Sequence, residues 1–509
     1  MDKHTRSLAT ALGLVAATVC APAEAAWKPD PSFGPNGVKL LAPFPGASQS
    51  LVASAADPQG RIVAVGTLIQ GGQRDLMVMR FLADGREDPG FGFGGSVSID
   101  TGVADESALA VAVQADGSAV IAGSRGRGAM LLRLTPMGAL DAGFGTNGYT
   151  VPAFMTGSAA RLVDVALDSQ GRAVALGTVT GDGGAARVNA FVMRTEVDGR
   201  LDRAFDLDGV RVLREFDALA AALVVGPGDR TVLVGYHGQE YRLAALTSAG
   251  SLDLGFGSGG VSRSVVGNGA IATDLVVHNN SYFVSGLNAA PLVRFNAAGF
   301  RDAGFGQGGI VRGAMPVEAW TLSPLADGTL GVGGSCRGGA GAGWYLATLA
   351  VNGTTLSTTT CEVVASGSTL AVVRSLQPDV TRLVAVGHRY DATGAASALL
   401  RFTAQASVVT PVPAPTASSP LDPRCSKPVF RRNNPLLCAP PPVVIATPTT
   451  VTPPAPVATP APVVVPTPTP TPMPTPVAAP PRPVVVQAPP TDPRCSRPIF
   501  RRNNPSLCR

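Results

Sequence analysis

The chain has 509 residues and a net charge of +5 at pH 7, and its composition changes sharply near residue 405. All 60 glycines lie before that point, whereas 30 of the 45 prolines lie in residues 411–509. The first part can bury a large core, but a Pro/Thr/Val tail without glycine excludes a second globular domain. The tail carries ten Lys or Arg against two Asp, so an anionic partner belongs to the tail.

Residues 1–25 predict a secretory signal peptide. Lys3 and Arg6 precede an apolar stretch, residues 8–19, that is too short to cross a bilayer and is followed by small residues. Cys20 offers lipid attachment as an alternative, although Val19 is branched where that processing favours a small residue. Signal cleavage leaves six cysteines, an even number that suits an oxidising compartment. We expect an exported protein, in the periplasm, on the cell surface or secreted, with no transmembrane segment after cleavage.

A short motif, called the corner below, recurs six times between residues 30 and 309. Each copy has Asp, then Phe three residues later, usually followed by Gly, and the phenylalanines are 49 to 61 residues apart. Self-similarity at this period, with Gly-rich turns between copies, is typical of a propeller or solenoid. The corner residues are Asp30, Phe33, Asp88, Phe91, Asp141, Phe144, Asp202, Phe205, Asp253, Phe256, Asp302 and Phe305.

Each period predicts a four-stranded antiparallel sheet, or blade. In the second unit we expect strands at 109–114, 119–122, 130–135 and 149–151. Seven equivalent first turns predict seven blades. The last unit, about 370–404, supplies only three strands, and residues 30–41 supply the missing corner and strand. Pairing of the chain ends removes an open sheet edge, so we expect an all-β, seven-bladed propeller over residues 26–404 rather than a solenoid.

The corner residues have structural roles before functional ones. Asp accepts hydrogen bonds from turn amides, Phe wedges between blades, and Gly permits backbone angles that a side chain forbids. Five blades place an arginine before the second turn, and we expect each to pair with a corner Asp, so that Arg401 reaches Asp30 across the closure. Only Asp202, Asp206 and Asp208 offer a calcium alternative, and we expect structural use there and no metal. The five arginines are Arg80, Arg133, Arg194, Arg294 and Arg401.

The Leu-Asp-x-x-Phe-Gly-x-x-Gly corner, the Asp-Gly-Arg-like first turn and the Arg-Phe/Leu third strand resemble the delta-sixty repeat of bacterial secreted and surface proteins. The resemblance covers roughly residues 30–404 and implies a seven-bladed β-propeller and export, but no activity. The unit at 317–364 departs from the pattern, because Leu356 stands where Asp is expected and no Phe-Gly follows. That unit also holds Cys336 and Cys361, and a disulfide at its loop ends is a candidate substitute for the lost corner.

Catalytic motifs are sparse in the sequence. After the signal there are three histidines, without metal-ligand spacing, and there is no nucleophile elbow or haem-attachment motif. We therefore assign no catalytic residue and expect no cofactor.

Two polar clusters follow the second strands of their blades and fall on one face of the predicted ring. Water-facing polar loops account for both, but together they are the best candidate surface for a protein or glycan partner. Because the clusters are three blades apart, they do not form one compact site. The first contains Tyr236, His237, Glu240 and Tyr241, and the second contains His388, Arg389, Tyr390 and Asp391.

The tail contains a duplicated basic module, at 422–438 and 492–509, after a Pro-rich linker at 405–421. Each copy brackets Arg-Arg-Asn-Asn-Pro with cysteines 13 residues apart, which predicts a disulfide within each module rather than a metal site. Residues 439–491 predict a disordered spacer rich in Pro, Thr and Val. The predicted bonds join Cys425 to Cys438 and Cys495 to Cys508, and the predicted binding residues are Arg431, Arg432, Arg501 and Arg502.

Two classes of function stay open. The first is an exported, non-enzymatic adaptor, whose propeller binds a partner and whose modules tether it bivalently to an anionic envelope or matrix component. Alternatively, the modules only end a spacer. The second class is a propeller hydrolase or lyase that acts on a polymer through His237, Glu240, His388 and Asp391. Nucleic acid is not expected as a partner, because each module has one aromatic residue.

Overall fold

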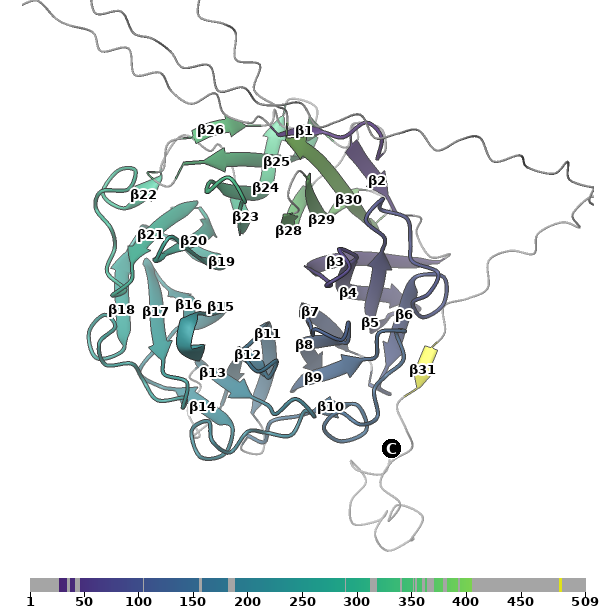
Figure 1. Ribbon diagram of the computed structural model, residues 1–509, viewed down its shortest axis with the longest axis horizontal. Helices are drawn as coiled ribbons and strands as arrows, with labels where there is room; N and C mark the ends of the chain where they lie inside the picture. Colours follow the sequence, from purple (N-terminus) through teal and green to yellow (C-terminus); the bar gives the residue numbers. More distant parts are fainter. Residues whose placement is uncertain are drawn as a thin grey trace, which may run out of the picture. The chain divides into compact units, whose positions relative to one another are not determined.

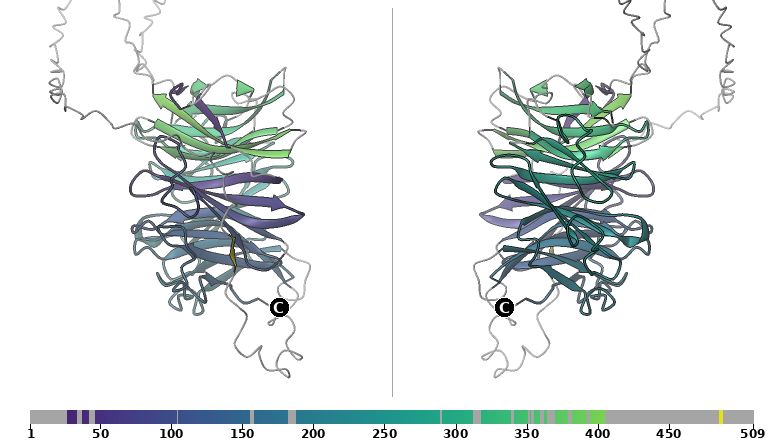
Figure 2. Two further views of the ribbon diagram at one scale, coloured as in Figure 1. Left: turned by 90° about the vertical axis from the view of Figure 1, so that its right-hand side faces the viewer. Right: turned by 90° about the vertical axis from the view of Figure 1, so that its left-hand side faces the viewer.

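Seven sheets of antiparallel strands surround a common axis in the computed structural model (Figure 1). In the side views the strands run roughly along this axis, so their connections lie at two opposite faces (Figure 2). Described are residues 27–33, 37–41, 46–103, 105–154, 158–181, 188–288, 290–311, 318–338, 341–350, 352, 355–358, 362–363, 370–378, 382–391, 394–404 and 485–487. Among them, no helix has the length and apolar character needed to cross a membrane.

Six blades follow one another along the chain, each running from an inner to an outer strand. The first three are β3 (Ala47–Ala56), β4 (Ile62–Gln70), β5 (Gln73–Phe81) and β6 (Ser96–Asp100); β7 (Glu106–Val113), β8 (Ala119–Arg125), β9 (Gly128–Leu134) and β10 (Tyr149–Thr150); and β11 (Ala159–Leu167), β12 (Ala173–Thr180), β13 (Val188–Arg194) and β14 (Val210–Leu213). The next two are β15 (Leu219–Val225), β16 (Thr231–His237), β17 (Glu240–Leu246) and β18 (Val261–Val265), with the 3-10 helix η2 (Pro227–Asp229) after β15; and β19 (Ile271–His278), β20 (Ser281–Leu287), β21 (Leu292–Asn296) and β22 (Ile310–Val311).

The sixth blade lacks the corner and divides its outer strand. It consists of β23 (Glu318–Pro324), β24 (Leu330–Gly338), β25 (Gly341–Leu349), β26 (Thr355–Thr358) and β27 (Glu362–Val363), and both β26 and β27 pair with β25. Cys336 is buried and disulfide-bonded. Cys361 lies outside the described residues, so the pairing of these two cysteines stays a prediction.

The seventh blade joins the two ends of the ring. Its strands β28 (Leu370–Pro378), β29 (Arg382–Asp391) and β30 (Gly394–Ala404) are completed by β1 (Trp27–Pro29) and β2 (Val38–Leu40), which both pair antiparallel with β30. The predicted seven blades and the predicted closure by the N-terminal segment are therefore confirmed. The closing strand is in two pieces, because the Asp30 corner lies between them.

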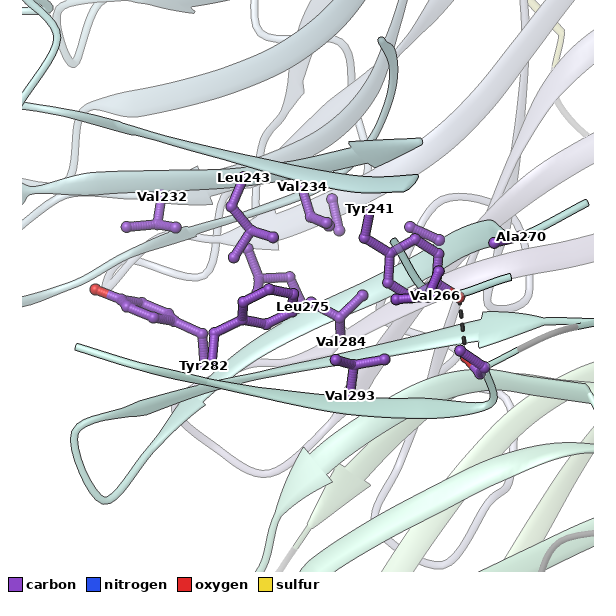
Figure 3. Packing of buried hydrophobic residues seen from close by; sticks show 14 of the residues in the cluster. Val232, Val234, Tyr241, Leu243, Val266, Ala270, Leu275, Tyr282, Val284 and Val293 are labelled. Atoms are coloured by element: carbon purple, nitrogen blue, oxygen red, sulfur yellow. Dashed lines mark hydrogen bonds between the residues drawn. The ribbon is translucent and has the colours of Figure 1, made fainter. Parts of the chain in front are cut away.

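Hydrophobic clusters fill the seven interfaces between neighbouring blades. Between the fourth and fifth blades, Tyr241 lies among valines and leucines of both sheets and donates its hydroxyl to the carbonyl of Ala290 at 2.9 Å (Figure 3). This burial raises the pKa of the Tyr241 hydroxyl. The hydrophobic core is thus divided into clusters between neighbouring blades, because each sheet buries apolar side chains on both of its faces.

The corners join consecutive blades, which explains why their residues repeat. In the corner of the third blade, Asp202 accepts the amide of Ala204 at 2.8 Å through one oxygen and Arg194 Nε at 2.7 Å through the other. Arg194 lies over the ring of Phe205, with 4.9 Å from guanidinium carbon to ring centroid, and donates to the carbonyl of Ser248 in the next blade at 2.5 Å. One arginine therefore holds its own corner and the neighbouring turn together.

The predicted arginine–aspartate ion pairs are present in all five blades expected to have them. The fifth corner, at Asp253, was not expected to have such a partner, because Ala245 stands where the other corners have arginine. Arg230 fills this place from the first turn of the blade, 2.7 Å from Asp253 and over the ring of Phe256. The contact is thus kept although the residue comes from another strand connection.

Of the tail, the structure describes only β31 (Val485–Gln487), which lies parallel to β6 with Gln487 opposite Asp100. This strand falls within the segment predicted to be a disordered spacer. The signal segment, the linker and both basic modules, with Cys425, Cys438, Cys495, Cys508, Arg431, Arg432, Arg501 and Arg502, lie outside the described residues.

Candidate functional site on the loop face

The inner strands begin at one face of the ring, and the connections between second and third strands lie at that same face. In the first blade, for example, Ala47 at the start of β3 is opposite Gln70, which in turn pairs with Gln73. We call this face the loop face. The corners, at the other ends of the third strands, lie on the opposite face.

A cavity of about 650 Å³ opens on the loop face over the first three blades. Its charged residues are Arg74, Asp105, Arg127 and Arg161, so arginines outnumber acids there. Half of the other lining residues carry hydroxyl groups, and one carries an amide. These polar residues are Ser48, Gln49, Ser50, Thr67, Ser107, Ser124, Thr178 and Thr180.

The strands of neighbouring blades hold these groups in place. Ser107 and Ser124 lie on adjacent strands of the second blade with their hydroxyl oxygens 2.9 Å apart. Arg74 and Asp105 approach each other across the first blade boundary, 3.9 Å between Nη1 and Oδ1, and both side chains stay more than half exposed. The cavity can therefore offer hydrogen-bond donors and positive charge to an oxygen-rich ligand.

The first predicted cluster divides between the surface and the core. His237 is exposed, with Nδ1 2.8 Å from the carbonyl oxygen of Asp217, and Tyr236 is half-buried. Glu240 is half-buried and pairs with Arg242 at 2.9 Å, whereas Tyr241 is fully buried between blades. Only part of this cluster is therefore exposed on the loop face.

The second cluster is at the closure. His388 is 3% exposed, and its Nδ1 lies 3.1 Å from the carbonyl oxygen of Leu51 on the inner strand of the first blade. Burial, with the nearby charge of Arg374, lowers the pKa of His388 to about 4. Arg389 is half-buried, and the side chains of Tyr390 and Asp391 are outside the described ones. His388 thus serves the contact between the two ends of the ring.

The two clusters lie in the fourth and seventh blades, and none of their residues lines the cavity over the first three. Sequence reasoning missed the cavity because its hydroxyl residues are spread singly over three repeats and belong to no motif. The signal that was available is the recurrence of Ser or Thr near the starts of the inner strands and the ends of the second strands.

At the fourth corner, where calcium was the alternative, two of the three carboxylates pair with arginines. Asp202 is within 3.0 Å of both Arg172 and Arg194, and Asp206 lies 3.5 Å from Arg211. Asp208 is exposed and accepts the amide of Val210 at 2.9 Å. These contacts give the three carboxylates structural roles.

Two further carboxylates lie on inner strands. Asp164 accepts the amide of Leu223 in the next blade at 2.8 Å, and Asp274 accepts that of Leu322 in the same way at 2.8 Å. Enclosure by the inner strands raises the pKa of Asp164 to about 7, and the charge of Asp274 adds to this rise. Both groups therefore join neighbouring blades and titrate away from their ordinary range.

Comparison with solved structures finds several proteins at low similarity. A virginiamycin B lyase from Staphylococcus aureus with quinupristin is 9% identical, with 71% of this chain and 98% of that chain covered and a TM-score of 0.46. YCF48 from Cyanidioschyzon merolae is 11% identical, over 72% and 98%, with a TM-score of 0.42. An aldose sugar dehydrogenase from Streptomyces coelicolor, in its PQQ-bound form, is 12% identical, over 72% and 98%, with a TM-score of 0.34. All three values are too low to support an argument about this chain.

Comparison with curated protein sequences finds no significant match. A family described as a "Domain of unknown function (DUF5122) beta-propeller" matches residues 58–91 and 114–144. Both segments run from the first turn of a blade to a corner phenylalanine, Phe91 or Phe144. Over these two repeats, the chain is similar to that β-propeller family.

Proposed function

We propose that this protein is an exported, non-enzymatic binding protein of the delta-sixty repeat type. The propeller takes an anionic glycan, or an acidic protein segment of like chemistry, in the loop-face cavity. The two basic modules tether the protein to an anionic envelope or matrix component. The observation that carries this proposal is the cavity itself, where arginines and hydroxyls converge from three blades.

The chemistry of the cavity favours binding over turnover. Sugar hydroxyls suit Ser, Thr and Gln side chains, and a sugar carboxylate suits a guanidinium. Of the described lining residues, Asp105 is the one acid, and none is a His, Cys, Tyr or Lys. A hydrolase needs an acid and a base near one bond, and the polymer-cleaving alternative relied on residues that the fold separates.

Binding of an oligouronate to the full-length protein tests the propeller's role. We expect calorimetry to show saturable binding, and Arg161→Ser to weaken it by about tenfold or more, because one charge-assisted hydrogen bond is lost. Arg263→Ser is the matched control, since Arg263 is an exposed strand arginine of the fourth blade. A neutral oligosaccharide that binds equally well would contradict the role of the arginines. Shortened products after long incubation would favour the enzyme alternative.

The tail is tested separately with the same full-length protein. Binding to vesicles that contain anionic lipid, or to an anionic envelope polymer, should fall with added salt and with Ser at positions 431, 432, 501 and 502. Because these substitutions leave the propeller intact, they should not change oligouronate binding. Unchanged vesicle and polymer binding in the substituted protein would reduce the modules to ends of a spacer.

A further inference from the structure

Three carboxylates from three strands meet between the first and second blades. Asp75 lies on β5, Asp100 ends β6, and Glu106 begins β7. One carboxylate oxygen of each lies within 4.8 Å of those of the other two. Residues far apart in the sequence are thus brought to one point by the blade boundary.

Some of the oxygens in this cluster are buried without a partner. Glu106 is 0% exposed, and its Oε1 accepts the amide of Thr101 at 2.9 Å and also the Thr101 hydroxyl. Its Oε2, and Oδ1 of Asp75, are buried and make no hydrogen bond within the part of the chain that the structure describes. A buried carboxylate oxygen without a donor is costly, so these atoms indicate a missing positive group.

The neighbouring arginines do not supply that charge. Arg74 pairs with Asp105, at 3.9 Å, rather than with the cluster. Arg125 donates to the hydroxyl and the carbonyl of Thr101, at 2.6 and 2.7 Å. Burial raises the pKa of Glu106 to about 7, and the charges of Asp100 and Asp75 add to this rise. Burial and the charge of Asp100 likewise raise the pKa of Asp75.

We propose that Asp75, Asp100 and Glu106 form a binding site for a hard divalent cation, and that Ca²⁺ is the ion that fits it. All three donors are carboxylates, which hard cations prefer, and no thiol or imidazole points to zinc or copper. Oxygens within 4.8 Å of one another fit around one Ca²⁺ at its metal–oxygen distance of about 2.4 Å, whereas Mg²⁺ requires a shorter, near-octahedral shell and gives up its water ligands reluctantly. Water and backbone oxygens complete the shell.

The site has a structural consequence for the loop face. Asp75 follows Arg74 and Glu106 follows Asp105, and both of those neighbours line the cavity. A cation that joins β5, β6 and β7 therefore fixes the boundary that carries one wall of the cavity. The inference rests on the carboxylates alone and does not depend on the proposed ligand.

Calorimetry on the full-length protein, freed of metal with EDTA and dialysed, tests the proposal. We expect one Ca²⁺ to bind per chain, Mg²⁺ to bind at least about tenfold more weakly, and the melting temperature to rise with Ca²⁺ concentration. Glu106→Gln and Asp75→Asn should each weaken Ca²⁺ binding by about tenfold or more, because each removes a charged ligand. Asp208→Asn is the matched control, because Asp208 belongs to the carboxylates of the fourth corner. This variant should bind Ca²⁺ like the wild type.

Two readouts separate loss of the site from loss of the fold. In EDTA, Glu106→Gln should melt at or above the wild-type temperature, because a neutral amide relieves the repulsion among the carboxylates. Its melting temperature should not respond to Ca²⁺. The absence of a binding heat and of a melting shift at millimolar Ca²⁺ in the wild type would overturn the proposal. So would equal loss of binding in Asp208→Asn.

Discussion

Gly199 shows how a single residue is fixed by a neighbouring blade. It lies in the second turn of the third blade with φ of +85°, and an added Cβ would lie 2.6 Å from the Gly145 amide nitrogen and 2.7 Å from the Phe144 ring. Gly171, in the first turn of the same blade, has a similar φ of +76° but no atom within 4 Å of such a Cβ. Substitution of the two glycines therefore separates the cost of backbone strain from the cost of a steric clash between blades.

We expect Gly171→Ala to lower the free energy of unfolding by about 1 kcal/mol, since only a left-handed conformation is strained. Gly199→Ala should cost roughly 1–3 kcal/mol more, because Phe144 and the Gly145 backbone must move apart. Urea unfolding of the two variants beside the wild type measures the difference. Equal costs would show that the corner phenylalanine does not rely on the glycine for its place.

At the scale of the strand, the inner strands share a β-bulge that the sequence does not predict. All seven contain a shift of register by one residue at equivalent positions. Such a bulge bends the strand by inserting one residue that has no opposite residue in the register of the neighbouring strand. The inserted residues are Val52, Leu109, Val163, Ala221, Thr273, Trp320 and Arg374. Because they have no chemistry in common, no residue pattern could have predicted the bulges.

The blades themselves were predictable for the opposite reason. Corner Asp and Phe residues and turn glycines recur because each meets a specific partner in the fold, and the absence of a fourth strand after residue 404 pointed to the closure. The candidate binding residues were harder to place. Tyr241 and His388 are polar and were predicted in loops after second strands, which suggested an exposed face. They lie instead within β17 and β29, and their partners are carbonyl groups of neighbouring blades. The sequence shows that a residue is polar, but it does not show which buried group that residue contacts.

His388 makes the contact between β29 and β3 dependent on pH. Its pKa is about 4 in the fold, below its ordinary value of 6.5, so the unfolded chain binds more protons between these values. The free energy of unfolding should therefore rise with pH across this window, by up to about 3 kcal/mol from this group. His388→Asn should flatten the rise, whereas His237→Asn, at an exposed histidine, should leave it intact. Urea unfolding at pH 4.5 and 7 measures both, and a slope unchanged in His388→Asn would contradict the assignment.

At the scale of the whole molecule, an arginine–aspartate ion pair at the closure of the ring matches the ion pairs at the corners of the other blades. Asp30 pairs with Arg401 at 2.8 Å, and Asp88 pairs with Arg80 at the same distance. All four side chains are buried, and the fold lowers the pKa of both aspartates. The two corners differ in the chain between their partners, which is 371 residues long at the closure and 8 residues long in the first blade.

This difference predicts unequal consequences of one substitution. In Asp88→Asn, the short connection keeps the outer strand beside its neighbour after the ion pair is lost. In Asp30→Asn, the N-terminal segment gains much more conformational entropy when it detaches, because a far longer chain separates the partners. Hydrogen exchange, followed by mass spectrometry, should therefore accelerate by about tenfold or more in β30 of Asp30→Asn, which corresponds to about 1.4 kcal/mol of local stability. In Asp88→Asn, exchange in β5 should change much less. Equal acceleration in the two strands would mean that the hydrophobic interface, rather than the corner, keeps the ring closed. Because an opened seventh blade exposes the edge of β30, the same variant should also aggregate sooner on warming than Asp88→Asn does.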